Sequence, residues 1–313
     1  MRRFVLSLLI LCSSFGAAYA FEPALRSQDA SAVPTLRHAL LIAGEFTGII
    51  DEEGREVWST RGGAKDATRL EDGHILLTYP DEVVEFDAGK ARVWRFEKAA
   101  SDAELVSAWR LENGRTLIVV LGDAPRLIEV DAAGVTQSST PLDPEQTDNQ
   151  HMQTRMARKL ANGDYLVPHL LGFSVKEYRP DGTIVADFQT DTERFDRKEA
   201  RNWPFTAIRL ANGNTVVGCT YGNRVVEFDA HGEVVWELTN ADVGGIIKDA
   251  CGVQRLPNGN TVVTSYGQRE PGAVKLFEVT PDKELVWTYR GHHAHHFQVL
   301  TTNAEPVPGP PLK

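Results

Sequence analysis

Short apolar segments alternate with glycine-containing turns along most of the chain. The first recurring phrase ends a segment with leucine, turns at Asn-Gly or Asp-Gly and enters an apolar run, as in RLENGRTLIVV and RLANGNTVVGC. Asn-Gly or Asp-Gly between apolar-rich runs is typical of a tight β-hairpin. A second phrase, as in VVEFDAHGEVVW, carries Asp-x-x-Gly at its turn, where glycine supplies a positive φ. Each unit therefore predicts an antiparallel meander of four strands.

The leucine of the first phrase marks a repeat. It stands at positions 70, 111, 160, 210 and 256, with separations of 41, 49, 50 and 46 residues. Four-stranded units that recur about every 40–50 residues are typical of a β-propeller. Helical periodicity is nearly absent, and only one short helix is expected, over residues 97–105. The pattern predicts an all-β fold, a six-bladed β-propeller of four-stranded blades.

A sixth unit is divided between the two ends of the chain. Residues 38–60 supply the second, third and fourth strands of a blade but not its first. The C-terminal segment HHFQVL supplies that strand, because Leu300 lies 44 residues after Leu256. The predicted propeller therefore spans residues 38–300. Pairing of its last strand with the N-terminal blade removes two sheet edges.

The segments outside the repeat have their own signatures. Residues 1–20 carry two arginines near the start, an apolar run and a final Ala-Tyr-Ala, the pattern of an export signal peptide. No later apolar run approaches the roughly 18 residues that a membrane span needs. Residues 21–37 are a lead segment and residues 301–313 a proline-rich tail, of which Glu305–Lys313 is expected to be dispensable. We expect a monomeric protein that is periplasmic or secreted.

Charge and cysteine content narrow the choice of partners. The formal net charge is −10, and it becomes −12 when the signal peptide and its two arginines are removed. No nucleic-acid partner is expected, because phosphate contacts with basic clusters supply most of that affinity. Cys219 and Cys251 either pair in an oxidising compartment or remain two buried thiols, and the thiols are the expected state.

The two faces of the predicted propeller differ in their loops. Both glycine turns fall on one face, here called the turn face, and they are short and uniform. The connections between blades fall on the opposite face, here called the variable-loop face, and carry nearly all the variation in loop length. Binding residues concentrate on long variable loops that a rigid scaffold holds. We therefore expect the functional site on the variable-loop face, where the inner strands enter the central channel.

Counting back from the repeat leucine identifies the residues around this channel mouth. Five positions before the leucine stand Lys65, Val106, Arg155, Phe205, Cys251 and His295. Four positions before it stand Asp66, Ser107, Met156, Thr206, Gly252 and His296. Further candidates on the loops and strand ends are Gln153, Trp203, Lys248, Asp249, His293, His151, His169 and Tyr221. The mouth is predicted to be polar, mixed in charge and rich in histidine.

Arginine and lysine residues at the mouth are the ligand-binding candidates. Arg155, close to His151 in sequence, is the strongest candidate for binding an anion, because a guanidinium recognises anions through two parallel hydrogen bonds. A salt bridge from Arg155 to a neighbouring blade is an equal alternative. The Lys-Asp pairs at 65–66 and 248–249 either bind substrate or form solvated ion pairs, and the ion pairs are favoured. The arginine or lysine that precedes each repeat leucine recurs with the repeat and is expected to be structural.

Histidines supply the catalytic and metal-binding candidates. His295, His296 and His151 are the catalytic candidates. His293 and His295 alternate onto one face of a strand, a spacing compatible with metal ligation. A third ligand could come only from Asp249 or His151. Histidines that contact water in the channel are commoner than histidines that bind a metal, so we assign no residue to a metal site. A metal ion bound in the channel remains an alternative.

Part of the repeat resembles a known family. EFDAHGEVVWE and IIDEEGREVWS resemble the tryptophan-docking repeat of propellers of the pyrroloquinoline-quinone (PQQ) type. The tryptophan stands at 58, 94, 236 and 287, where the repeat phase indicates packing between blades, and Ser138 and Ala186 replace it in two blades. The resemblance implies the propeller and not the cofactor. Quinoprotein dehydrogenases of this type have eight blades and often two adjacent cysteines, so PQQ binding is not expected here.

A second resemblance implies an enzyme. The LPNGN turn at Leu256–Asn260 is similar to turns of bacterial arylsulfotransferases, which are exported six-bladed propellers with a nucleophilic histidine at the channel mouth. By that resemblance His295, His296 or His151 would be the nucleophile and Arg155 would hold the sulfate. The extra N-terminal domain of those enzymes is missing here. Two classes therefore remain: a binding protein for a small molecule, glycan or protein partner, which is favoured, and an enzyme for sulfuryl transfer or carbohydrate lysis or hydrolysis.

Overall fold

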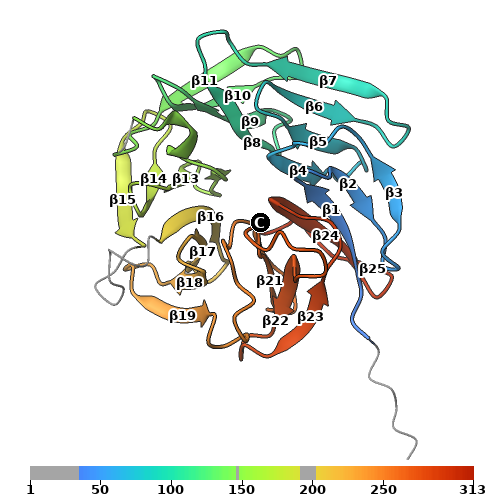
Figure 1. Cartoon of the computed structure of the whole chain (residues 1–313). Coiled ribbons are helices and arrows are strands. Elements are labelled where there is room, and N and C mark those ends of the chain that lie inside the picture. Colours follow the sequence, from blue (N-terminus) through green and yellow to red (C-terminus); the bar gives the residue numbers. More distant parts are fainter. Residues whose placement is uncertain (1–34, 146–147, 191–201) are drawn as a thin grey trace, which may run out of the picture. The chain divides into compact units, whose positions relative to one another are not determined.

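Six antiparallel sheets form the blades of a propeller, as the repeat predicts (Figure 1). The computed structural model describes residues 35–145, 148–190 and 202–313, so the expected signal peptide and most of the lead segment lie outside the described residues. In the described part of the chain, no helix is long and apolar enough to cross a membrane. The helix expected at 97–105 is wrong, because strand β8 begins at Glu104 and the residues before it form a turn.

The strands follow one another outward from the channel in each blade. Blade 1 consists of β24 (His296–Thr302), β1 (His38–Ala43), β2 (Gly48–Ile50) and β3 (Glu56–Ser59). Blade 2 consists of β4 (Asp66–Arg69), β5 (Ile75–Thr78), β6 (Glu82–Phe86) and β7 (Arg92–Glu97). Blade 3 consists of β8 (Glu104–Arg110), β9 (Thr116–Leu121), β10 (Arg126–Val130) and β11 (Thr136–Pro141).

The other three blades have the same arrangement. Blade 4 follows the 3₁₀ turn η1 (Gln150–Met152) and consists of β12 (Arg158–Lys159), β13 (Tyr165–His169), β14 (Ser174–Tyr178) and β15 (Ile184–Gln189). Blade 5 consists of β16 (Trp203–Arg209), β17 (Thr215–Thr220), β18 (Arg224–Phe228) and β19 (Val234–Thr239). Blade 6 consists of β20 (Val253–Arg255), β21 (Thr261–Thr264), β22 (Leu276–Val279) and β23 (Leu285–Tyr289).

The predicted hairpin turns and packing are present. Gly259 has a φ of 88°, and the Asn258 side-chain oxygen accepts a hydrogen bond from the Asn260 amide at 3.0 Å, which fixes the tight turn. Apolar side chains fill the spaces between blades; Leu76 of blade 2, for example, packs in one cluster with Ile118 of blade 3. Burying each side chain of this size stabilises the fold by about 1.5–3 kcal/mol.

Ion pairs also join successive blades from blade 2 to blade 6, in a series that we call the glutamate belt. In each case a glutamate on the third strand of one blade accepts from the cationic residue that precedes the repeat leucine in the next blade. These contacts confirm the expected structural role for four of the five cationic residues, and Arg69 of blade 2 has no ion pair among the described residues. The pairs are Glu85–Arg110, Glu129–Lys159, Glu177–Arg209 and Glu227–Arg255.

The ring closes between blade 6 and blade 1 by a different pair. The inner strand β24 pairs with β1, with Leu40 opposite Val299, as the repeat phase predicts (Figure 1). Val299 occupies the position that carries the belt cation in other blades. His38 of β1 replaces that cation, and its Nε2 lies 2.5 Å from the buried carboxylate of Glu278. The belt therefore continues across the seam with a residue from the other end of the chain.

The C-terminal tail does not lie apart from the propeller. Strand β25 (Glu305–Pro306) pairs with the channel side of β24, and the Leu312 carbonyl accepts from the Arg255 amide at 2.9 Å. Lys313 is only 1% exposed, and the chain ends at the centre of the ring (Figure 1). Proline gives the tail few amide donors, but its carbonyls and the Val307 amide still pair with the inner strands. The expectation that Glu305–Lys313 is dispensable is not supported by this packing.

We expect the His38–Glu278 pair to contribute more to the free energy of unfolding than the other pairs of the glutamate belt. Glu278→Ala should lower the free energy of unfolding by at least about 2 kcal/mol, because His38 would lose its acceptor in a fully buried site. Glu227→Ala is the matched control, since its pair with Arg255 is partly exposed. The measurement is chemical denaturation of both single variants and of double-mutant cycles for the two pairs. Equal coupling energies in the two cycles would contradict a special role for the seam.

Candidate functional site

Residues from five blades meet at the channel mouth on the variable-loop face. The Arg155 guanidinium lies 5.7 Å from the centroid of the Phe205 ring, and the edge of the His295 ring lies against Phe205 at 4.9 Å. Nδ1 of His295 lies 3.2 Å from the Lys65 carbonyl oxygen. Tyr266 also packs edge-on against His295, at 5.1 Å. Counting back from the repeat leucine thus identified four residues that the fold does bring together.

Arg155 is a buried cation without an acidic partner. Its side chain belongs to a residue that is 2% exposed, and Nη1 donates to the Thr154 carbonyl at 2.7 Å. Its Nε has no hydrogen-bond partner, and no carboxylate of the described residues lies within the 4.0 Å of an ion pair. Burial lowers the pKa of Arg155 to about 10, while the Glu104 charge acts in the opposite direction. The guanidinium therefore stays charged at neutral pH, and within the described residues the predicted alternative of a salt bridge to a neighbouring blade is not found.

Glu104 links Arg155 to His151. The carboxylate of Glu104 contacts Nδ1 of His151, which stands on η1 and is exposed. Burial alone would raise the pKa of Glu104, but the hydrogen bond from His151 and the charges of Arg155 and Lys65 hold it below its ordinary value. A carboxylate that holds an imidazole in this way can orient it for proton transfer. Glu104 was overlooked in the sequence, although it stands seven positions before Leu111 and the same count identified Gln153 and Trp203 in other blades.

His295 is held as a neutral imidazole. Desolvation lowers its pKa to about 3, and the charge of Arg155 acts in the same direction. A carbonyl oxygen can only accept, so Nδ1 must carry the proton that it donates to Lys65. The lone pair is then on Nε2, which has no protein hydrogen-bond partner in the described part of the chain. Such a nitrogen can accept a proton or act as a nucleophile.

His296 and Asp66 lie deeper in the channel and not at its mouth. Both are at most 1% exposed, and Nδ1 of His296 lies 3.0 Å from Oδ1 of Asp66. The same oxygen accepts from Nζ of Lys313 at 3.0 Å. The expectation that Asp66 forms a solvated pair with Lys65 is therefore wrong, because Asp66 is buried and paired with Lys313. His296 is therefore buried, whereas His151 is exposed on the variable-loop face.

Two other candidates have structural contacts. The Gln153 side chain is buried and makes two hydrogen bonds with the backbone of Gly122, at 3.2 and 2.9 Å. His169, at the end of β13, is fully buried, and its Nε2 lies 2.8 Å from the Tyr178 hydroxyl. Burial lowers the pKa of His169 to about 3. Both side chains stabilise loops below the surface.

The remaining candidates order the loops of blades 5 and 6. The Trp203 ring stacks on Tyr221 at 4.8 Å, and the Asp249 carboxylate accepts from the Tyr221 amide at 3.0 Å. The Lys248 carbonyl accepts a hydrogen bond from the Gly267 amide at 2.8 Å, and Lys248 is exposed. Cys219 and Cys251 are buried thiols and do not form a disulfide with each other, as expected.

The predicted histidine pair does not assemble a metal site. Nε2 of His293 contacts the Tyr266 carbonyl, and its ring packs on the Tyr266 ring at 4.6 Å. Within the described ranges, one group of three side chains has its potential metal-ligand atoms close together. It consists of Asp72, His74 and Glu85. Glu85 already accepts from Arg110 as a member of the glutamate belt. The grouping therefore follows from blade packing.

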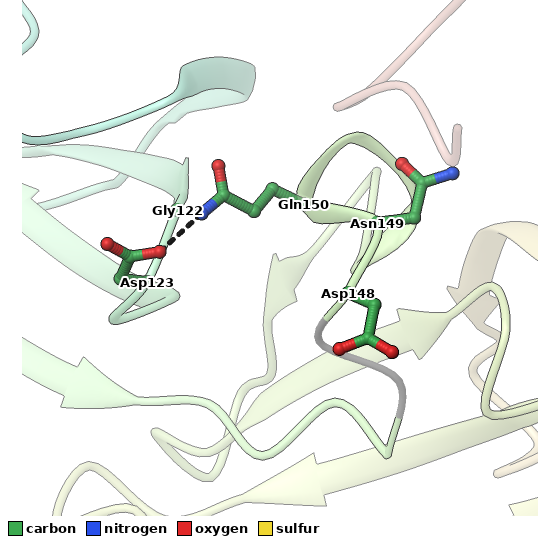
Figure 2. A pocket seen from close by; sticks show the side chains of 5 residues that line it. All are labelled: Gly122, Asp123, Asp148, Asn149 and Gln150. Atoms are coloured by element: carbon green, nitrogen blue, oxygen red, sulfur yellow. Dashed lines mark hydrogen bonds between the residues drawn. The ribbon is translucent and has the colours of Figure 1, made fainter.

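A separate hollow lies on the same face beside η1. Figure 2 shows its lining, in which the Gln150 amide donates to Asp123 at 2.5 Å. The hollow has a volume of about 530 Å³ and is lined by Gly122, Asp123, Asp148, Asn149 and Gln150. Two carboxylates and two amides make this lining unsuited to an anion. An anion site on this face would instead lie at Arg155.

Comparisons with known proteins support the fold. No family model and no curated protein matches the sequence. A protein of unknown function from Bacteroides caccae superposes with a TM-score of 0.73 and 20% identity, over 83% of this chain and 98% of that chain. A catalytically inactive virginiamycin B lyase from Staphylococcus aureus, solved with quinupristin, superposes with a TM-score of 0.56 and 11% identity, over 82% and 85%. These identities show a shared propeller fold only, and the resemblances to PQQ-type repeats and arylsulfotransferases stay predictions.

We expect Asp66 to contribute to the acid sensitivity of the protein. Burial would raise its pKa, but Lys313 and His296 hold the pKa well below the ordinary value. Its stabilising contribution is therefore present above about pH 4 and is lost as the pH falls towards the folded-state pKa. Asp66→Asn should reduce the fall in unfolding free energy between pH 6 and pH 3 by more than about 1 kcal/mol. The exposed turn variant Asp282→Asn is the control, and an equal pH slope in both variants would contradict this account.

Proposed function

We propose that this propeller is an exported protein that binds an anionic small molecule at its channel mouth, with Arg155 as the anion-binding residue. The observation that carries the proposal is the buried Arg155 guanidinium, which has an unpartnered Nε and no carboxylate within ion-pair distance among the described residues. The belt arginines, in contrast, all contact glutamates. A buried cation without a counter-charge is costly, and an anionic ligand would supply that charge.

The surroundings of Arg155 favour an anion attached to a flat or apolar group. Phe205 and Tyr266 present ring surfaces beside the neutral His295. Carboxylate, sulfate and phosphate groups match the planar fork of a guanidinium. An aryl sulfate, an aryl carboxylate or a uronic-acid residue of a glycan has the required combination.

We expect Arg155→Met to lower the affinity for such ligands by about 10- to 100-fold, because a charge-assisted hydrogen bond contributes about 1.5–3 kcal/mol. The measurement is isothermal titration with phenyl sulfate, benzoate and glucuronate, with phenol and glucose as neutral controls. Arg155→Lys keeps the charge but loses the fork and should bind with intermediate affinity. Arg269→Lys is the matched control, since Arg269 is exposed and contacts the Tyr266 hydroxyl. Equal binding of phenol and phenyl sulfate, or no effect of Arg155→Met, would contradict the proposal.

A second candidate function is catalysis at the same mouth. The free Nε2 of His295 and the Glu104-bound imidazole of His151 are a potential nucleophile or base and a potential acid. The virginiamycin lyase among the structural neighbours offers an analogy in fold alone. Sulfuryl transfer and carbohydrate lysis or hydrolysis are the reactions to test.

His295→Ala separates the two candidate functions. We expect it to change the free energy of unfolding by less than about 1 kcal/mol, because the side chain is partly exposed and makes one hydrogen bond. For a binding protein, affinity changes and no substrate is turned over by either form. For an enzyme, product formation from p-nitrophenyl sulfate or from uronate-containing glycans is lost while ligand binding through Arg155 persists. Unfolding of the variant would show instead that His295 is a structural part of the closing strand.

A further inference from the structure

The deep layer of the channel surrounds the ammonium of Lys313 with acceptors. Its Nζ donates to the Ala67 carbonyl at 2.8 Å and to Oδ1 of Asp66 at 3.0 Å. Nδ1 of His296 is a third neighbour, at 3.3 Å. These groups come from the inner strands of blades 1 and 2 and are buried. They form a cradle for a single nitrogen that has three protons.

The rest of residue 313 is held separately from its ammonium. A main-chain oxygen of Lys313 accepts a hydrogen bond from Nε of Arg158 at 2.9 Å, and the Leu312 carbonyl accepts one from the Arg255 amide at 2.9 Å. The side chain passes Trp109, with Nζ 5.7 Å from its ring centroid. Backbone hydrogen bonds therefore hold the C-terminal tail in position, and the cradle contacts only the ammonium group of Lys313.

The cradle also has unused hydrogen-bonding capacity. Oδ2 of Asp66 and Nε2 of His296 are buried without protein hydrogen-bond partners. Nη2 of Arg158 lies 3.8 Å from Oδ2 of Asp66, which is an ion-pair distance and not a hydrogen bond. The carboxylate thus remains available on one side to a further donor.

We propose that the central channel is a binding site for a primary alkylammonium group and that Lys313 occupies this site as an intramolecular ligand. Two oxygen acceptors at hydrogen-bond distance fit a primary ammonium, and His296, whose Nδ1 also contacts the Asp66 carboxylate, orients one of them. A quaternary ammonium has no proton to donate, and the planar guanidinium needs acceptors side by side. The site is distinct from the anion site at Arg155 and does not depend on it.

The test is chemical rescue in the full chain. Lys313→Ala removes three methylenes and the ammonium, and n-propylammonium has the missing atoms. We expect the variant to melt several degrees below the native chain and n-propylammonium chloride at tens of millimolar to restore at least half of that shift, because a ligand that binds only the folded state raises its stability. Equal concentrations of 1-propanol and tetramethylammonium chloride should not restore it. If Lys313→Ala does not fold alone, the yield of refolding from denaturant with the same additives is the readout.

Matched variants make the outcome decisive. Lys313→Met keeps the stem without the ammonium and should not respond to n-propylammonium, and the same holds for Lys313→Ala combined with Asp66→Asn. Lys283→Ala removes a partly exposed lysine paired with Asp242 and measures the general effect of the salt. A response of Lys283→Ala equal to that of Lys313→Ala would overturn the proposal. Equal rescue by 1-propanol would also overturn it, because the site would then recognise only the apolar stem.

Discussion

Every blade of this protein depends on the closure of the ring between β24 and β1. A propeller has no other means of removing its two free edges, and here the two strands come from opposite ends of the chain. The buried His38–Glu278 contact lies at this seam and continues a pattern of glutamate-cation pairs that joins successive blades. The geometry of the channel follows from this closure, since the inner strands reach their places only when all six blades are in the ring.

The repeat phase was sufficient to predict the fold and part of the mouth. Six leucines at a similar spacing defined the inner strands, and the residues five positions earlier included Lys65, Arg155, Phe205 and His295, which do meet. The closing strand could be assigned because Leu300 kept the period. These features could be predicted because each depends on a backbone geometry that recurs in every blade.

The features that the sequence analysis missed depend on contacts rather than on position in the repeat. Glu104 keeps the repeat phase, seven positions before Leu111, but its role follows from its contact with His151 and its proximity to Arg155, which a count of positions cannot show. Lys313 follows four prolines and belongs to no blade, so its burial depends on a cradle formed by residues of blades 1 and 2. Asp66 was assigned to its sequence neighbour Lys65, whereas its actual partner lies 247 residues away.

The channel of an acidic protein concentrates positive charge. The chain carries a net charge of −10, yet Arg155, Arg158 and Lys313 are buried along its axis and Asp66 is the carboxylate between the last two. A low-dielectric wall around these groups strengthens their interactions with a ligand compared with the same groups in water. The net negative charge of the protein therefore does not prevent the channel from holding buried cationic side chains.

The placement of β24 constrains the order in which the molecule can form during synthesis. Strand β1 is made early, but its inner partner is made about 250 residues later, near the end of the chain. Ribosomes add about 5–20 residues each second, so β1 waits on the order of 10 seconds or more with an unpaired edge. Blade 1 can therefore be completed only after His296–Thr302 has been synthesised, and residues 305–313 can enter the channel only after that blade exists. The early strand of the first blade is thus one of the last elements to become fully paired.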